Sequence, residues 1–229
     1  MGALHQGHLS LVEQALIYND VAIVSIFVNP TQFDNAVDLK KYPRTLEKDA
    51  ALLETLSKNI LIYAPTVHDI YEGKTIAQHF SFDGLEHEME GKFRDGHFDG
   101  VGTIVKRLFE IVTPNNAYFG EKDFQQLAII KKLVEKYNIP VKIEGCKIHR
   151  ESNGLAMSSR NTRLKLDYKI AAPFIYKTLN TAKEKFKTTS ANKVKTLKTV
   201  KRKSNKKNYR AFIAVYADDI RLIDNIALN

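Results

Sequence analysis

The sequence predicts an α/β protein in which a doubly wound parallel sheet is followed by a smaller α+β domain. Three observations predict this architecture. Short apolar runs alternate with segments of helical periodicity over the first part of the chain. The pattern changes after Arg160, where a helical segment, a lysine-rich stretch and an alternating segment follow one another. Finally, a length of 229 residues fits one large domain or two unequal ones.

The predicted strands are short and apolar. Val21–Val28 is a run of β-branched and aromatic residues bounded by Asn-Asp and Asn-Pro. Such a run is typical of a parallel strand that is covered on both faces. Similar runs follow at Ile60–Ala64, Ala117–Phe119 and Val141–Cys146.

Helical patterns lie between the predicted strands. The apolar positions from Leu9 to Tyr18 suit a helix that begins close to His8. Two further apolar stripes have helical spacing: Val101, Val105, Leu108 and Val112, and then Leu127, Ile130, Leu133 and Val134. Strands that alternate with helices predict a parallel sheet with helices on its faces.

We place a domain boundary between 1–148 and 149–229. In the second part, Asp167–Lys187 is mostly helical in pattern despite Pro173. Tyr209–Asn225 alternates like one or two antiparallel strands. These elements predict a small C-terminal α+β domain.

The formal charge of +9 belongs to one segment. Thr181–Arg210 holds twelve Lys and Arg residues and a single acid, Glu184, which gives a local charge of +11 and leaves −2 for the other residues. A solvated surface segment and a contact with RNA or another acidic partner both explain such a stretch. The segment contains no nucleic-acid-binding motif, so we favour the solvated surface.

The composition also restricts the compartment. No stretch approaches the roughly 18 consecutive apolar residues of a membrane-spanning helix. Cys146 is the only cysteine and therefore cannot form an internal disulfide. The first residues lack the pattern of a signal peptide. We therefore expect a cytoplasmic protein without a membrane partner.

The first eight residues, MGALHQGH, contain two histidines three residues apart at a predicted helix start. His5 and His8 would lie on one side of the first turn, where backbone N–H groups and the helix dipole favour an anion. Gly2 and Gly7 would let a ligand approach the backbone. A phosphate site, a weak metal pair and plain surface histidines all remain compatible with this spacing.

A second cluster, Gly120-Glu121-Lys122-Asp123 with Gln125-Gln126, lies where a short strand meets a helix. Ligands of open α/β sheets bind outside the carboxyl ends of strands, where a lysine could reach a phosphate and an acid could hold ribose hydroxyls. The alternative is an ordinary acidic first turn of a helix.

A third cluster, Gly154–Asn161, is a loop of small residues that ends in two hydroxyls and an arginine. Hydroxyl and guanidinium donors suit a phosphate chain. A helix N-cap explains the Ser158-Ser159 pair equally well.

A fourth cluster follows the run Val21–Val28. Asn29 and Gln32 present amide groups beside Phe33, as a pocket for a small hydroxylated acid requires. The alternative is a plain turn after a strand, which Asn-Pro also favours.

Taken together, these segments resemble the pantothenate synthetase family, the pantoate–β-alanine ligases. The segments that carry the resemblance are MGALHQGHLSLV (Met1–Val12), SIFVNPTQF (Ser25–Phe33), YPRT (Tyr42–Thr45), GHFDGV (Gly96–Val101), YFGEKDFQQL (Tyr118–Leu127) and NGLAMSSRN (Asn153–Asn161). The resemblance runs in order from Met1 to about Leu164 and resumes at RLIDN, Arg221–Asn225. The HxGH element alone would indicate only the wider nucleotidyltransferase superfamily.

The resemblance implies a Rossmann-like first domain, a small second domain that covers the active site, and a two-step reaction. ATP and pantoate would form pantoyl adenylate and pyrophosphate, and the amine of β-alanine would then displace AMP to give pantothenate. The catalytic residues implied are His8, as proton donor, with His5, Lys122, Ser158, Ser159 and Arg160. The implied ATP-binding residues are Met1, Gly2, Ala3, Leu4, His5, Gln6, Gly7, His8, Gly120, Glu121, Lys122, Asp123, His149, Met157, Ser158, Ser159 and Arg160. The implied pantoate- and β-alanine-binding residues are Gln32, Gln126, Asn29 and Arg94.

The family likeness also concerns partners and metal. It implies a homodimer, with ATP as a substrate and Mg²⁺ held mainly by the ATP phosphates, so we assign no metal ligand from the protein. The chain departs from the family pattern in three places. Asp95 replaces a proline before Gly96, His149 stands where an aliphatic residue usually lines the adenine site, and the region from Lys169 to Arg210 matches poorly and is short.

Two other functions compete with this one. Another adenylyl- or nucleotidyl-transferase of the same superfamily would share His5 and His8 but would have no reason to carry FVNPTQF and Gln125-Gln126. A non-enzymatic RNA-binding protein would use the lysine-rich segment and would bind RNA in a salt-sensitive way.

We also expect that Met1 is not where the complete protein begins. A doubly wound nucleotide-binding fold runs a strand directly into its phosphate-binding turn, and family members carry such a strand before the matching methionine. The place between Val21–Val28 and Ala117–Phe119 should then be unpaired or filled by another segment. Direct pairing of these two strands would contradict the expectation.

Overall fold

The structure, a computed structural model, describes residues 1–33, 36–188 and 208–229, so most of the lysine-rich segment lies outside the described residues. The chain divides into two compact units, Met1–Lys147 and Ile148–Asn229, and each is described by itself. No helix in the described ranges is long and apolar enough to cross a membrane.

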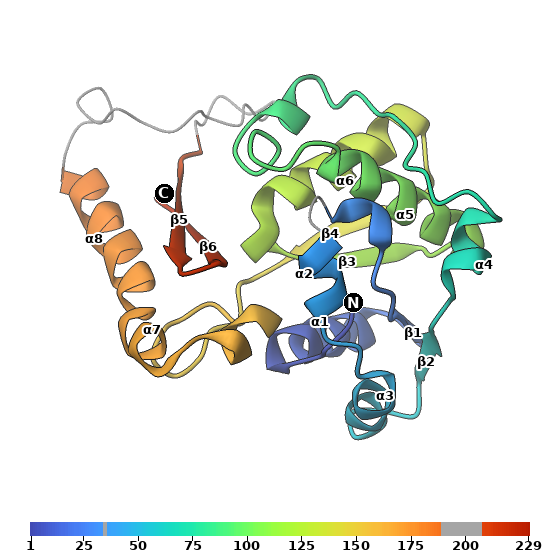
Figure 1. The fold of residues 1–229 in the computed structure, drawn as a ribbon, viewed down its shortest axis with the longest axis horizontal. Helices are drawn as coiled ribbons and strands as arrows, with labels where there is room; N and C mark the ends of the chain where they lie inside the picture. The colour runs from blue at the N-terminus through green and yellow to red at the C-terminus, as the bar shows by residue number, and fades with distance from the viewer. Residues whose placement is uncertain (34–35, 189–207) are drawn as a thin grey trace. The chain divides into compact units, whose positions relative to one another are not determined.

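The first unit alternates strands and helices (Figure 1). Its elements in chain order are α1 (Gln6–Tyr18), β1 (Ala22–Ser25), η1 (Pro30–Gln32), α2 (Ala36–Lys41), α3 (Leu46–Glu54), β2 (Ile60–Tyr63), α4 (Val67–Tyr71), η2 (Leu85–His87), α5 (His97–Val112), β3 (Asn116–Gly120), η3 (Glu121–Asp123), α6 (Phe124–Tyr137) and β4 (Lys142–Cys146).

The strands of the first unit pair in parallel, which confirms the predicted α/β class. β1 pairs with β2 in the register Ala22↔Ile60, and β3 pairs with β4 in the register Asn116↔Lys142. These are two separate ladders, since β1 and β3 share no ladder in the described part of the chain. Direct hydrogen-bonded pairing of β1 with β3, which would have contradicted the expectation stated above, is therefore not found among the described residues.

Met1 runs alongside the end of β1. Its backbone nitrogen donates to the Ser25 carbonyl at 2.7 Å, and its carbonyl accepts from the Phe27 N–H at 2.9 Å. The HxGH turn is thereby tied to the carboxyl end of a strand, where ligands of α/β folds bind.

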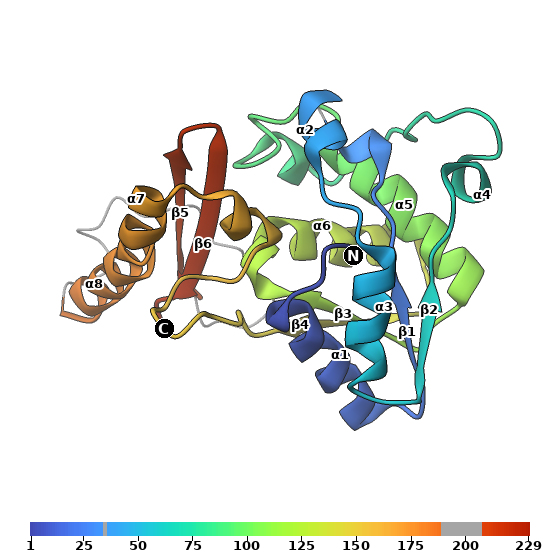
Figure 2. The ribbon, with the colours of Figure 1, turned by 60° about the horizontal axis from the view of Figure 1, so that its bottom comes forward.

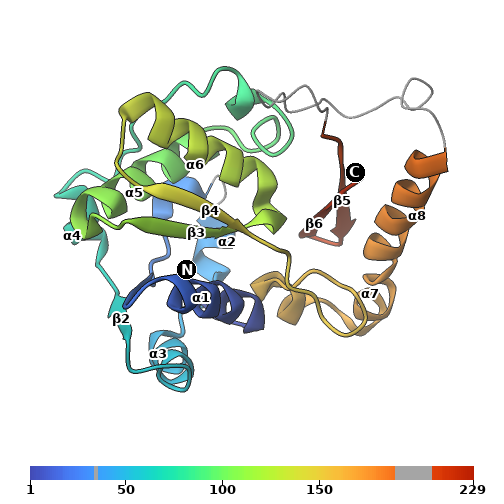
Figure 3. The same cartoon turned by 180° about the vertical axis from the view of Figure 1, so that it is seen from behind.

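Helices cover the two sides of the β3–β4 ladder. In Figure 3, α5 and α6 lie on one side and α1 on the other, and α6 contacts both strands while α1 contacts β3. The apolar stripes of α5 and α6 form one core cluster, into which Ala117, Phe119 and Ile143 pack. A second cluster joins α1 and α3 to β1 through Leu9, Val12, Val24 and Leu53.

The prediction that Val21–Val28 is covered on both faces is wrong. Only Ala22–Ser25 forms the strand, and buried and exposed residues alternate along it. Ile23 is 45% exposed and its partner Leu61 is 57% exposed, so among the described residues helices cover only the opposite face. An apolar run indicates that a strand can be buried. The number of faces that become buried depends on which helices pack against the strand.

The second unit is a small α+β arrangement. It contains η4 (Ser159–Arg163), α7 (Leu166–Ala171), α8 (Phe174–Thr188), β5 (Arg210–Ala217) and β6 (Ile220–Ala227). Pro173 separates α7 from α8, because proline cannot continue a helix without losing a hydrogen bond. β5 and β6 form an antiparallel hairpin that packs against α8 (Figure 2).

Candidate active site

The start of α1 brings the two N-terminal histidines together. His5 is the N-cap residue, and its Nδ1 accepts the Gly7 N–H at 3.2 Å. The His5 carbonyl accepts the N–H groups of His8 at 2.7 Å and Leu9 at 3.1 Å. The rings of His5 and His8 stack with centroids 4.0 Å apart. The three-residue spacing therefore places both imidazoles on one side of the first turn, as expected.

His8 is neutral at pH 7 in this arrangement. Its pKa is lowered from 6.5 to about 3, above all by burial and then by the nearby positive charges of His5, the amino terminus and Lys122. Its Nδ1 is buried and has no hydrogen-bond partner in the described residues. A buried nitrogen without a partner costs free energy unless a ligand satisfies it. His8 is therefore a candidate for binding a ligand through this nitrogen.

We expect this depressed pKa to make stability depend on pH. Between pH 6.5 and about 3 the unfolded chain binds a proton at His8 that the folded protein excludes, so stability falls as the pH falls through this window. His8→Gln should make the free energy of unfolding less steep in this window by up to about 1.4 kcal/mol per pH unit. Urea denaturation at pH 7, 5.5 and 4.5 measures this slope, and equal slopes for both proteins would contradict it.

Lys122 lies close to this histidine pair. It sits in η3, directly after the end of β3, and its ammonium is 3.9 Å from the Asp123 carboxylate. Its charge contributes to the low pKa of His8, and α1 contacts β3. A Cβ added at Gly120 would meet nothing within 4 Å, so a ligand has room beside this backbone. Glu121 is half-buried and Asp123 is exposed.

Asn29 lies in the loop after β1, and both its Nδ2 and its Oδ1 form hydrogen bonds within the protein. It is 3% exposed, its Nδ2 donates to the Gly100 carbonyl at 3.1 Å, and its Oδ1 accepts from the Tyr71 hydroxyl and, at 3.2 Å, from Thr31. A Cβ at Gly100 would lie 2.3 Å from the Thr31 carbonyl oxygen, so this close approach requires glycine. Asn29 therefore stabilises the loop that follows β1.

Gln32, at the end of η1, is held by its backbone. Its carbonyl accepts from His97 Nδ1 at 2.9 Å and from the Arg94 guanidinium at 3.2 Å, and that guanidinium also donates to His97 Nε2 at 3.1 Å. No hydrogen bond is present at the Gln32 side-chain amide among the described residues. The arrangement leaves this amide available to a ligand.

The two adjacent glutamines of α6 have different surroundings. Gln125 is buried, accepts the Glu90 N–H at 2.9 Å and donates to the carbonyls of Leu85 and Glu88 at 2.8 and 2.6 Å. Gln126 is half-buried, and its amide makes no hydrogen bond within the ranges the structure describes. Gln125 therefore ties a loop to α6, and Gln126 is the glutamine left for a ligand.

The second unit carries the remaining residues implied by the resemblance. The Met157 N–H donates to the His149 carbonyl at 3.0 Å, which closes a short antiparallel loop through the Arg150↔Ala156 bridge. Ser158 is the N-cap of η4, and its Oγ accepts the Arg160 N–H at 3.2 Å. Half-buried positions in this loop and the start of η4 include His149, Met157, Ser158, Ser159 and Arg160.

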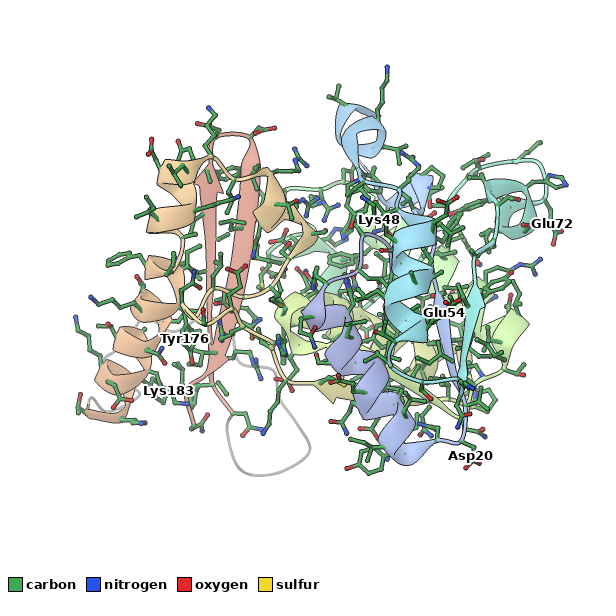
Figure 4. The ribbon with its side chains drawn as sticks, turned by 90° about the horizontal axis from the view of Figure 1, so that it is seen from below. Asp20, Lys48, Glu54, Glu72, Tyr176 and Lys183 are labelled. Carbon is green, nitrogen blue, oxygen red and sulfur yellow. The ribbon has the colours of Figure 1, made fainter. Side chains whose placement is uncertain are left out.

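Arg150 holds this loop against the rest of the second unit. Its guanidinium pairs with both oxygens of the buried Asp224 at 2.6 and 3.0 Å, donates to the Gly154 carbonyl at 3.1 Å and lies 3.7 Å from the ring centroid of Tyr176 (labelled in Figure 4). Arg150 was not among the residues predicted from the sequence, although its partner Asp224 lies within the RLIDN segment that resembles the family.

Asp49 is the second residue that the sequence analysis missed. It is 3% exposed on α3 and accepts the backbone N–H groups of Ala3 and Leu4 at 2.9 and 2.8 Å. Those two N–H groups are therefore engaged by the protein and not free for phosphate. The sequence did contain one indication that Asp49 is buried. Asp49 lies four residues before the apolar Leu53, so both residues lie on the same, buried face of α3.

The described residues contain no group of three or more His, Cys, Asp or Glu side chains that could hold a metal ion. The groups gathered at the start of α1 are imidazoles and an ammonium. Imidazole and ammonium groups can donate hydrogen bonds to phosphate oxygens. They are poor ligands for Mg²⁺, which prefers to be coordinated by oxygen atoms.

Comparison with known proteins gives consistent matches. A family model described as pantoate-beta-alanine ligase matches residues 1–227. The pantothenate synthetase of Flavobacterium psychrophilum is 59% identical over 252 aligned residues, which cover 100% of this chain and 89% of that protein. The pantothenate synthetase of Christiangramia forsetii is 54% identical over 253 residues with the same coverage of the two chains.

Solved structures match as well. The crystal structure of pantothenate synthetase from Thermus thermophilus has a TM-score of 0.89 and 35% identity, and the match covers 100% of this chain and 91% of that one. A pantoate-beta-alanine ligase from Francisella tularensis, complexed with beta-gamma ATP and beta-alanine, has a TM-score of 0.81 and 39% identity, with coverage of 100% and 87%.

Proposed function

The chain belongs to the pantoate–β-alanine ligase family and condenses pantoate with β-alanine in an ATP-dependent reaction, and we propose how its residues carry out this reaction. The observation that carries the proposal is the stacked pair of His5 and His8 at the start of α1, with Lys122 close by at the end of β3. These three side chains offer imidazole and ammonium groups to a phosphate, whereas the backbone N–H groups of Ala3, Leu4 and Gly7 are already bonded within the protein.

In the first step, the pantoate carboxylate attacks the α-phosphorus of ATP, and pyrophosphate leaves. The carboxylate is already ionised at neutral pH, so the step needs no general base. It needs in-line placement and donors that neutralise charge at the α-phosphate and the leaving group. Lys122 supplies a positive charge. His8 supplies a hydrogen-bonding nitrogen, and an anionic ligand would raise its pKa and let it act as the proton donor.

The amides of Gln32 and Gln126 bind pantoate. Support comes from the absence of hydrogen bonds between these two amides and the described residues, whereas the amides of Asn29 and Gln125 are bonded within the protein through both nitrogen and oxygen. Asn29 acts by holding the loop that presents Gln32. Arg94 holds the Gln32 carbonyl and offers its guanidinium charge to a carboxylate.

The nucleotide is held by further hydrogen-bonding groups, which are acceptors at the ribose and donors at the phosphates. Gly120 leaves space for the ribose, and Glu121 and Asp123 supply carboxylates near its hydroxyls. Ser158, Ser159 and Arg160 of the second unit supply hydroxyl and guanidinium donors to phosphate oxygens. The loop that carries His149 and Met157 contacts the adenine, His149 through its backbone, because its imidazole stands where the family usually has an aliphatic side chain.

In the second step, the neutral amine of β-alanine attacks the acyl carbon of the adenylate and AMP leaves. Exclusion of water protects this mixed anhydride from hydrolysis. When bound, Mg²⁺ would neutralise phosphate charge and would be held mainly through the ATP phosphates, as hard cations at nucleotide sites often are. We further propose that the protein is a cytoplasmic homodimer.

The reaction itself is tested by AMP release from the purified full chain. AMP should appear only when ATP, pantoate and β-alanine are all present, and exchange of pyrophosphate into ATP should require pantoate but not β-alanine. Exchange with another carboxylate or nucleotide and none with pantoate would favour a different member of the superfamily.

Gln32→Ala is expected to raise the KM for pantoate by about tenfold or more and to leave the KM for ATP nearly unchanged. A hydrogen bond to a charged ligand contributes about 1.5–3 kcal/mol, which corresponds to this factor. Steady-state kinetics with each substrate varied in turn measure both constants. Gln78→Ala, a change at an exposed glutamine of the same unit, is the control. An unchanged pantoate KM in the Gln32 variant would show that its assigned role is wrong.

A further inference from the structure

Asp49 is a buried carboxylate that the proposed reaction does not use directly. Its side chain is buried on α3, although an isolated buried charge is costly unless hydrogen bonds compensate it. Both of its oxygens are compensated. Oδ2 accepts the Ala3 N–H at 2.9 Å, and Oδ1 accepts the Leu4 N–H at 2.8 Å and the Thr45 hydroxyl at 3.2 Å.

The two backbone donors belong to the turn that leads into α1. Ala3 has a φ of +49°, the left-handed conformation that residues with a Cβ rarely adopt. Consecutive N–H groups around such a residue point toward one concave side and form an anion-binding nest. Here the occupant of the nest is the carboxylate of Asp49, and it holds the backbone in a conformation that the chain would not adopt alone.

His5 follows this turn directly. It is the N-cap of α1, and its ring stacks on that of His8. Any change in the backbone at Ala3 and Leu4 would therefore move both imidazoles relative to Lys122. Since the groups that act on a phosphate must be placed accurately, a displacement of about 1 Å can cost on the order of a hundredfold in rate.

We propose that Asp49 is a positioning residue for ATP, which fixes the turn that carries His5 and His8 by accepting the Ala3 and Leu4 N–H groups. The proposal rests on the proposed role of these histidines. Asp49 does not touch the substrate. It acts through the backbone of the turn. Its loss should therefore lower kcat/KM for ATP and leave the KM for pantoate nearly unchanged.

Asp49→Asn is the direct test, because asparagine keeps the size of the side chain but turns one acceptor into an amide donor that faces an N–H group. We expect kcat/KM for ATP to fall by about ten- to a hundredfold while the KM for pantoate changes less than about twofold. Glu54→Gln makes the same chemical change on an exposed residue of the same helix (Figure 4) and should leave both constants unchanged. An Asp49→Asn protein with unchanged ATP kinetics would overturn the proposal.

A spectroscopic readout separates positioning from general loss of structure. In Asp49→Asn the His8 ring should become better hydrated, so its pKa, followed by NMR titration, should move up from about 3 toward its ordinary range. The thermal unfolding midpoint should at the same time remain measurable and cooperative. A variant with weak ATP kinetics but an unshifted His8 would show that Asp49 acts elsewhere, which contradicts the proposal.

Amide hydrogen exchange in the unmodified protein covers the case in which the variant does not fold. The Ala3 and Leu4 amides should be strongly protected, because the buried carboxylate accepts both, whereas exchange as fast as that of an exposed loop amide would overturn the proposal. This measurement needs no catalysis. If the full chain were to lack ligase activity, the proposed function would fail, while protection at Ala3 and Leu4 would still report the hold of Asp49 on the turn.

Discussion

His8→Ala is expected to lower the rate of pantoyl-adenylate formation by about 10²-fold or more, because removal of one preorganised donor to developing charge has an effect of this size. His8 is half-buried and stacked on His5, and its Nδ1 has no partner in the described residues. Removal of the ring should therefore remove a nitrogen that is available to a ligand without breaking a hydrogen bond from His8 Nδ1 to the described protein. Pantoate-dependent exchange of pyrophosphate into ATP measures this step alone.

The control for this prediction is His68→Ala, which changes an exposed histidine of α4 in the same unit and should leave the exchange rate unchanged. Circular dichroism and the unfolding midpoint should show that His8→Ala still folds. An exchange rate within about threefold of the unmodified protein would mean that His8 does not act on the phosphates.

Asp224→Asn is expected to destabilise the second unit by about 3–5 kcal/mol, the usual cost of leaving one member of a buried ion pair without its partner. The Asp224 side chain is 2% exposed and pairs with Arg150, which is 16% exposed. Asparagine keeps the shape but leaves the guanidinium charge uncompensated. Denaturant unfolding, followed by a probe within 148–229, measures the loss.

Asp219→Asn is the matched control. Asp219 pairs with Arg163 at 3.4 Å and is 69% exposed, so its replacement should change the free energy of unfolding by less than about 1 kcal/mol. Equal effects of the two substitutions would show that the Arg150–Asp224 pair does not stabilise the loop 149–157.

The local elements were predictable because they depend on nearest-neighbour physics. The spacing of Leu9, Val12 and Leu16 predicts α1, and Gln6–Tyr18 is the helix found. The antiparallel strands after Tyr209 were likewise evident from the residues alone. Asp167–Lys187, predicted as mostly helical despite Pro173, instead divides at that proline into α7 and α8. Faces and boundaries were less predictable, as Ile23 and Leu61 show, because burial depends on which helices reach a strand.

The candidate site divides in the same way. His5 and His8 could be paired from their spacing alone, because three residues in a helix nearly complete one turn. The spacing and residue types alone do not distinguish Gln125 from Gln126, and only the family resemblance favoured Gln126. Only the packing of the loop 85–90 engages the amide of Gln125 and leaves that of Gln126.

The sequence by itself therefore determined the class of fold, the family and the pairing of His5 and His8 at the start of α1. These properties depend on residue types, short spacings and motifs, so each can be predicted without knowing the long-range contacts. The tertiary structure alone decided which polar groups form hydrogen bonds within the protein and which do not. Asp49 reaches Ala3 and Leu4 across 46 and 45 residues of chain, and hydrogen bonds of this kind arise only when distant segments pack together.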